Sequence, residues 1–139
     1  QLKKFPSFVE RRIHNFNYLK EALKGTEDKL ILPKACENSR PSWFGFLITC
    51  REGVDRNQIV QMIEAKGVQT RMLFAGNLTK HPCFDQMRAT GKGYRIAGTL
   101  ENTDRIMKDT FWIGVYPGMT DEMLEAMANA IKDAVNGVK

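Results

Sequence analysis

The side chains best suited to bind a ligand in this sequence lie in one short stretch: Arg71, Asn77, Thr79, Lys80 and His81. An arginine pairs with phosphate or carboxylate through a planar fork, and an asparagine both donates and accepts hydrogen bonds. The threonine, lysine and histidine add a hydroxyl, a cation and a ring that titrates near neutral pH. This stretch therefore predicts a loop that binds a ligand. Turns favour the same residue types, so a solvated turn after Gly76 is the alternative.

The sequence offers no residue set for covalent or metal chemistry. No serine, cysteine or aspartate is arranged to pair with His81, so we predict no hydrolytic site and assign no catalytic residue. The cysteines Cys36, Cys50 and Cys83 lie far apart and form no Cys-x-x-Cys pair. We read them as reduced thiols, with Cys50 in the core, and assign no metal to this chain.

A strand must position the binding loop, because a sheet fixes the base of a loop and leaves its tip free. The residues from Val68 to Phe74 predict that strand. Before it, Asp55 and Gln58 predict a capped helix that ends at Gly67, and the apolar run Trp43–Cys50 predicts a strand buried on both faces or nearly so. If the two strands pair side by side, this strand-helix-strand unit is parallel and right-handed.

Two further helices and a third strand are predicted nearer the ends of the chain. The first helix spans Phe8–Leu23, with a capping box formed by Ser7 and Glu10. The third strand spans Thr110–Tyr116, and Thr120 caps a last helix. The apolar stripe of that helix is predicted to be Met123, Met127, Ile131 and Ala134.

The segment 75–103 is predicted to be mostly loop, because it contains glycines at four positions and little apolar periodicity. A short helix from Phe84 to Ala89 is the one element expected there. The order of all these elements favours an α+β fold in which helices pack on one face of a short sheet.

Length and composition limit the classes of protein. The chain has 139 residues, of which 42% are hydrophobic and 27% charged, and this is typical of one globular domain. Its net charge of +5 favours an anionic partner only in general terms, because the basic residues are spread along the chain and favour a solvated surface. If the domain binds an anion, a nucleotide-sugar diphosphate would satisfy the charge as well as nucleic acid. No apolar run reaches about 20 residues, and the first residues lack the apolar core of a signal peptide. We therefore expect no membrane partner and a cytoplasmic location.

One motif favours RNA binding. Phe44-Gly45-Phe46-Leu47 matches the centre of the RNA-recognition octamer, in which aromatic side chains on a sheet stack on bases. The flanks do not match, since Ser42 replaces the basic residue, Trp43 the glycine and Thr49 the last aromatic residue. An RNA-binding module and a noncatalytic interaction module are the alternatives from other functional classes.

Two blocks of the sequence together resemble one family of enzymes. The blocks are residues 71–84 (RMLFAGNLTKHPCF) and residues 109–118 (DTFWIGVYPG). They resemble the C-terminal domain of the DegT/DnrJ/EryC1/StrS sugar aminotransferases and dehydrases, which use pyridoxal phosphate. They look most like the CDP-4-keto-6-deoxy-D-glucose 3-dehydrases of lipopolysaccharide dideoxysugar synthesis. The likeness runs from Phe8 to Val135.

The resemblance implies the small C-terminal domain of a fold-type I, aspartate-aminotransferase-like enzyme. Residues 1–25 would connect it to a large domain outside this chain, and residues 26–139 would form the small domain. This domain would close over a sugar nucleotide. The residues facing the substrate would be Arg71, Asn77, Leu78 and Thr79, with Lys80 and His81 at the rim.

The resemblance also implies a cofactor and partners. The cofactor would be pyridoxal phosphate or its amine form, pyridoxamine phosphate, held mainly by the large domain. An iron–sulfur cluster, present in some of these dehydrases, would lie outside this chain. A homodimer is implied for the full-length enzyme, and the isolated chain is expected to be inactive. A sugar aminotransferase containing the same domain is the nearest alternative.

Overall fold

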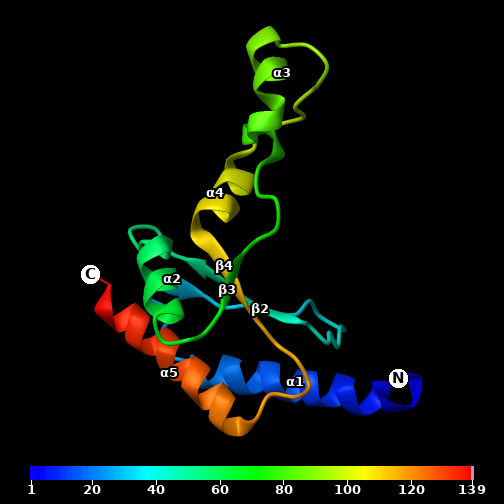
Figure 1. The fold of residues 1–139 in the computed structure, drawn as a ribbon, viewed down its shortest axis with the longest axis vertical. Helices are drawn as coiled ribbons and strands as arrows, with labels where there is room; N and C mark the ends of the chain where they lie inside the picture. The colour runs from blue at the N-terminus through cyan, green and yellow to red at the C-terminus, as the bar shows by residue number, and fades with distance from the viewer. Residues whose placement is uncertain (139) are drawn as a thin grey trace.

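The sheet of this protein has four strands, and three helices cover one of its faces (Figure 1). The computed structural model describes residues 1–138. The strands are β1 (Leu30–Ile31), β2 (Gly45–Cys50), β3 (Thr70–Met72) and β4 (Thr110–Gly114). The covering helices are α1 (Phe5–Ala22), α2 (Arg56–Glu64) and α5 (Asp121–Gly137). The predicted α+β class with helices on one face is confirmed, and the two-residue β1 was not foreseen.

The strand order is β1-β2-β4-β3, and every neighbouring pair is antiparallel. Strands β2 and β3 therefore run in the same direction, but β4 lies between them. The predicted strand-helix-strand unit exists with α2 as its helix, although its two strands do not pair side by side. The last strand in the sequence is thus an inner strand of the sheet.

The core lies between the covered face of the sheet and the three helices. Phe46, Ile48, Phe111 and Ile113 point from β2 and β4 into this layer and have no exposed surface. They are alternate residues, as a sheet with one buried face requires. Burial of each such side chain contributes about 1.5 to 3 kcal/mol. The second half of α1 also belongs to this core, because Leu19 is fully buried.

The predicted caps of α2 and α5 are confirmed. The Asp55 carboxylate accepts hydrogen bonds from the backbone N–H groups of Asn57 and Gln58. The Thr120 hydroxyl accepts one from Met123. These bonds satisfy backbone donors that have no partner within the helix.

The predicted capping box of α1 is wrong. The helix already begins at Phe5, and the Ser7 hydroxyl donates to the carbonyl of Lys4 at 2.8 Å. The predicted stripe of α5 is also wrong at its first member, because Met123 is 41% exposed whereas Leu124 is fully buried. The buried side of this helix is offset by one residue there.

The segment 75–103 contains more helix than predicted. The expected short helix exists as α3 (Asp85–Thr90), preceded by the 3₁₀ turns η2 (Leu78–Lys80) and η3 (Pro82–Phe84). A further helix, α4 (Glu101–Asp109), was missed and leads directly into β4. A third 3₁₀ turn, η1 (Leu2–Lys4), precedes α1. Figure 1 shows α3 and the chain that returns from it projecting away from the sheet, with α4 at the base of this lobe.

Candidate functional site

The uncovered face of the sheet presents a row of three side chains. Leu47 on β2 and Arg71 on β3 are both paired with Trp112 on β4. Residues directly opposite each other in an antiparallel pair point to the same face of the sheet. Arg71 is exposed and forms no ion pair within residues 1–138. The row therefore places a cation that has no carboxylate partner among the described residues next to an apolar surface.

Aromatic side chains extend this uncovered face. The ring of Phe44 meets the Trp112 indole edge-on, with centroids 5.5 Å apart, and Phe74 lies 6.2 Å from the same indole. Phe44 is 59% exposed and Phe74 74% exposed. With their neighbours these rings line a cavity of about 400 Å³. We call this surface the aromatic face; its members are Phe44, Leu47, Phe74 and Trp112.

The Trp112 indole is held in place from two sides. Its N–H donates to the carbonyl of Met72 at 3.1 Å. On the other side, the indole lies against the backbone of Gly45, where a Cβ atom would meet Trp112 Cε3 at 2.6 Å. A glycine is therefore needed for this close approach.

The segment after β3 is attached to α4 through Asn77. The Asn77 side chain is buried, with 2% of the residue exposed. Its Oδ1 accepts from the backbone N–H of Thr79 at 3.0 Å and from the Thr79 hydroxyl at 2.7 Å. Its Nδ2 donates to Asp104 Oδ1 at 2.7 Å. Asn77 thus caps η2 and binds it to the first half of α4.

Asp104 also pairs with Lys80, whose ammonium group lies 2.9 Å from Asp104 Oδ2. The hydrogen bond from Asn77, together with the Lys80 hydrogen bond and charge, holds the pKa of the Asp104 carboxyl below its ordinary value. The carboxylate is therefore charged at neutral pH and available to both partners. Asp104 was not foreseen as a site residue.

The remaining predicted residues lie on the outer side of this turn. Leu78 is 55% exposed, and His81 Nε2 lies 2.5 Å from the carbonyl of Ala75. Arg88 on α3 donates to the carbonyls of Thr79 and His81. The structure thus brings residues 77–81 together in one turn that side-chain hydrogen bonds stabilise, whereas Arg71 lies on the sheet.

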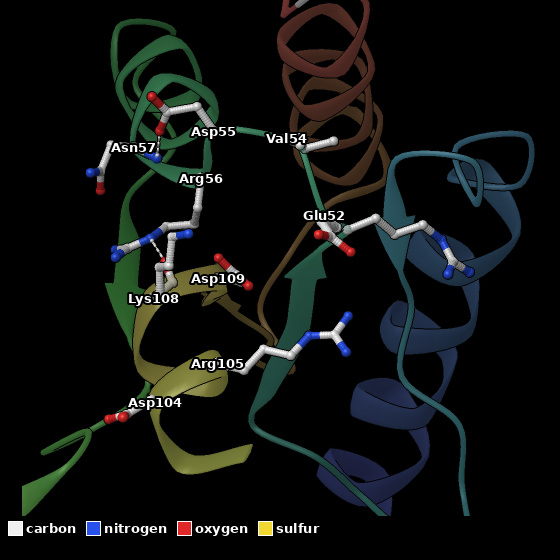
Figure 2. Close-up of a pocket in the computed structure, with 11 residues that line it drawn as sticks. Glu52, Val54, Asp55, Arg56, Asn57, Asp104, Arg105, Lys108 and Asp109 are labelled. Carbon is white, nitrogen blue, oxygen red and sulfur yellow. Dashed lines mark hydrogen bonds between the residues drawn. The ribbon is translucent and has the colours of Figure 1, made fainter. Parts of the chain in front are cut away.

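A second hollow lies between α2 and α4 and has a volume of about 760 Å³ (Figure 2). Its basic residues, Arg51, Arg56, Arg105 and Lys108, are matched by Glu52, Asp55, Asp104 and Asp109. Several of these groups already serve the fold, since Asp55 caps α2 and Arg56 Nε donates to the carbonyl of Lys108 at 2.9 Å. Because the basic and acidic side chains balance and several already bond within the fold, this hollow has no preference for an anionic ligand. We therefore do not assign the ligand-binding site to it.

The buried polar residues in the described part of the chain do not supply the charged groups that a site for pyridoxal phosphate needs. Such a site needs an amine or histidine near the aldehyde carbon, an acid near the ring nitrogen and donors for the phosphate. Every buried polar residue in the described chain is neutral: Asn15, Thr26, Thr70, Asn77 and Thr110. Within residues 1–138, no group of three or more histidines, cysteines, aspartates or glutamates could hold a metal ion.

Two other observations limit the alternatives. Phe46, the central aromatic residue of the RNA-recognition pattern, is fully buried in the core and cannot stack on a base. No helix in the described part of the chain is both long enough and apolar enough to span a membrane. All three cysteines are free thiols, as predicted. Cys50 is buried, also as predicted, whereas Cys36 and Cys83 are exposed.

Comparison with known proteins identifies a family and several relatives. The model of the DegT/DnrJ/EryC1/StrS aminotransferase family matches residues 1–132. The chain is 46% identical over 135 residues to the lipopolysaccharide biosynthesis protein RfbH of Salmonella typhimurium, covering 96% of this chain and 30% of that protein. It is 43% identical over 137 residues to the dTDP-4-dehydro-2,6-dideoxy-D-glucose 3-dehydratase of Saccharopolyspora spinosa, covering 97% of this chain and 28% of that protein.

A solved structure of similar fold is the GDP-4-keto-6-deoxy-D-mannose-3-dehydratase of E. coli with bound hydrated PLP. The TM-score is 0.77 at 23% identity, and the match covers 94% of this chain and 32% of that one. The chain therefore spans about a third or less of the length of the relatives that it matches.

Proposed function

Because the chain belongs to the DegT/DnrJ/EryC1/StrS aminotransferase family, we propose that it is the small C-terminal domain of a pyridoxal-phosphate-dependent nucleotide-sugar 3-dehydratase. The observation that carries this proposal is the identity of 46% and 43%, over nearly the whole chain, to a lipopolysaccharide biosynthesis protein and a sugar 3-dehydratase. The proposed substrate is CDP-4-keto-6-deoxyglucose, and the proposed pathway makes dideoxysugars for the O-antigen. In this proposal α1 connects the domain to the rest of a cytoplasmic homodimer.

We assign the aromatic face and the turn at residues 77–81 to one wall of the active site. The exposed guanidinium of Arg71 would pair with the substrate diphosphate, and the surface around Trp112 would pack against its apolar parts. Such a wall orients the sugar and excludes water from the reaction. The part of the polypeptide outside this chain would hold the cofactor, which supplies an electron sink when the 3-hydroxyl is lost.

The experiment that tests this proposal uses the full-length protein with pyridoxamine phosphate and CDP-4-keto-6-deoxyglucose. The expected result is a sugar that carries hydrogen in place of its 3-hydroxyl and is therefore lighter by one oxygen atom, measured by mass spectrometry, while pyridoxamine phosphate is converted to pyridoxal phosphate and ammonia. The dTDP- and GDP-linked 4-keto sugars serve as competing substrates. If the protein instead transfers an amino group from glutamate to the sugar, it is an aminotransferase and the proposal is wrong.

Two variants test the assigned wall. Arg71→Ala removes a charge-assisted contact worth about 1.5 to 3 kcal/mol, so KM is expected to rise about 10- to 100-fold. Arg105→Ala is the matched control, because Arg105 is also an exposed arginine but lies on α4, in the second hollow. Equal KM values for the two variants would remove Arg71 from the site.

A further inference from the structure

Asparagine side chains often bind ligands, but the hydrogen-bonding groups of Asn77 already have partners within this chain. Its side-chain oxygen accepts two hydrogen bonds from Thr79, and its amide nitrogen donates to Asp104. Only 2% of the residue is exposed. A side chain in this position cannot reach a substrate on the surface without giving up bonds that are costly to leave unmade when buried.

Asp104 is the group that joins two parts of the turn. One of its oxygens accepts from Asn77, and the other pairs with Lys80 at 2.9 Å. Asn77 and Lys80 are the N-cap and the last residue of η2. A single carboxylate on α4 therefore holds both ends of this 3₁₀ turn. We call Asn77, Lys80 and Asp104 the turn clamp.

The turn clamp determines how neighbouring side chains are presented. Leu78 lies inside the clamped turn and is 55% exposed. His81 follows the turn directly and bonds back to Ala75. Because the clamp fixes both backbone segments, it sets the direction in which each side chain leaves the backbone, and the bond to Ala75 also fixes the His81 ring. Pre-organisation of this kind lowers the entropic cost of binding.

We propose that Asn77 and Asp104 are positioning residues for substrate binding, and that they act through Leu78 and His81 rather than by touching the nucleotide sugar. This inference rests on the proposed function, since it assigns the turn to that active site. It replaces a direct role for Asn77 with an indirect one and adds Asp104, 27 residues away, to the site.

The test exchanges the two polar groups in the full-length protein. Asn77→Asp keeps the acceptor for Thr79 but places a second carboxylate oxygen where Nδ2 now lies, 2.7 Å from Asp104 Oδ1. Repulsion between the carboxylates should open the clamp. The double variant Asn77→Asp with Asp104→Asn restores a donor and an acceptor at the same place. The new amide oxygen can then accept from Lys80, and the total charge of the clamp is unchanged.

Kinetics of the nucleotide-sugar reaction give the first readout. Asn77→Asp is expected to raise KM about tenfold while kcat changes less than about threefold, and the double variant is expected to return KM to within about threefold of the original. The control is Asn102→Asp, which adds the same charge to α4 at an exposed position. A tenfold rise in the control, or no rescue in the double variant, would overturn the proposal.

Limited trypsin digestion gives a second readout that needs no substrate. Lys92 and Arg95 are exposed in the lobe that the clamp supports. Cleavage after them is expected to accelerate in Asn77→Asp and to return to the original rate in the double variant. If digestion follows this pattern but KM does not change, the clamp holds the lobe without positioning a substrate, and the proposal is wrong. If no nucleotide sugar is turned over by the original protein, the proposed function fails, while digestion still tests the clamp.

Discussion

Substitution of Gly45 by alanine should destabilise the protein through a clash with Trp112. The added Cβ atom would lie 2.6 Å from Cε3, 3.2 Å from Cζ3 and 3.3 Å from Cδ2 of the indole. Ordinary contacts begin at 3.4 Å, so the ring must move by about 0.8 Å. That movement strains the 3.1 Å hydrogen bond from the indole to Met72.

The magnitude follows from two opposing effects. Overpacking of this kind costs about 1 to 3 kcal/mol, whereas replacing glycine by alanine in a strand stabilises by about 0.5 to 1 kcal/mol. The expected net loss for Gly45→Ala is therefore up to about 2.5 kcal/mol, with a central value of about 1.2 kcal/mol. For a chain of 139 residues, each kcal/mol corresponds to about 3 °C in Tm.

The structure provides a matched control across the strand pair. Gly114 is the partner of Gly45 in the register of β2 and β4, and a Cβ atom at Gly114 would have no heavy atom within 4 Å. Gly114→Ala is expected to be neutral or slightly stabilising. Urea denaturation measures both free energies of unfolding, and near-ultraviolet circular dichroism reports the Trp112 environment. If the two variants are equally stable and give equal spectra, the packing argument is refuted.

Two further predictions concern a helix cap and the thiols. Asp55→Ala should lower the free energy of unfolding by about 1 kcal/mol, because two backbone donors of α2 lose their acceptor. The control Asp28→Ala, at an exposed position, should leave the free energy of unfolding unchanged. Equal urea midpoints for the two variants would contradict this prediction. Burial, as the main cause, and the charge of Asp109, as the second, raise the pKa of the Cys50 thiol from 9.0 to about 11. A thiol reagent at pH 8 should therefore label the exposed Cys36 and Cys83 rapidly, and the buried Cys50 only after denaturation. Because folding favours the neutral thiol, its contribution to stability is complete below pH 9 and declines as pH rises toward 11, which pH-dependent unfolding can measure.

The elements that the sequence predicted correctly are those with local signals. Asp55 and Thr120 cap their helices as expected, because a cap needs only a side-chain oxygen and the next few backbone donors. The run Trp43–Cys50 predicts β2 because it is apolar and rich in aromatic and β-branched residues. The expected burial on both faces is wrong, since alternate residues of β2, such as the exposed Leu47, lie on the uncovered face. The α+β class follows from the order of such elements.

The parts that the sequence did not predict depend on distant contacts or weak patterns. Helix α4 has no side-chain cap at Leu100, and its nine residues include only two apolar side chains, Ile106 and Met107, so a repeat of apolar residues could not reveal it. The resemblance to the family implied that Asn77 faces the substrate, and that stays a prediction; its bond to Asp104 was not foreseen, because the two residues lie 27 positions apart in the sequence. The aromatic face was not foreseen either, although Trp112 alternates with the buried Phe111 and Ile113 and could have been placed on the opposite face.

The position of β4 inside the sheet has a consequence for synthesis of the protein on the ribosome. The side chains of Thr49 and Thr110 lie 2.9 Å apart across β2 and β4, yet they are 61 positions apart in the sequence. Until the ribosome has delivered β4, the edges of β2 and β3 that it will join have no neighbour, and closing so long a loop slows folding. The nascent chain therefore exposes strand edges with unpaired N–H and C=O groups during this interval, when chaperones or wrong partners can bind them.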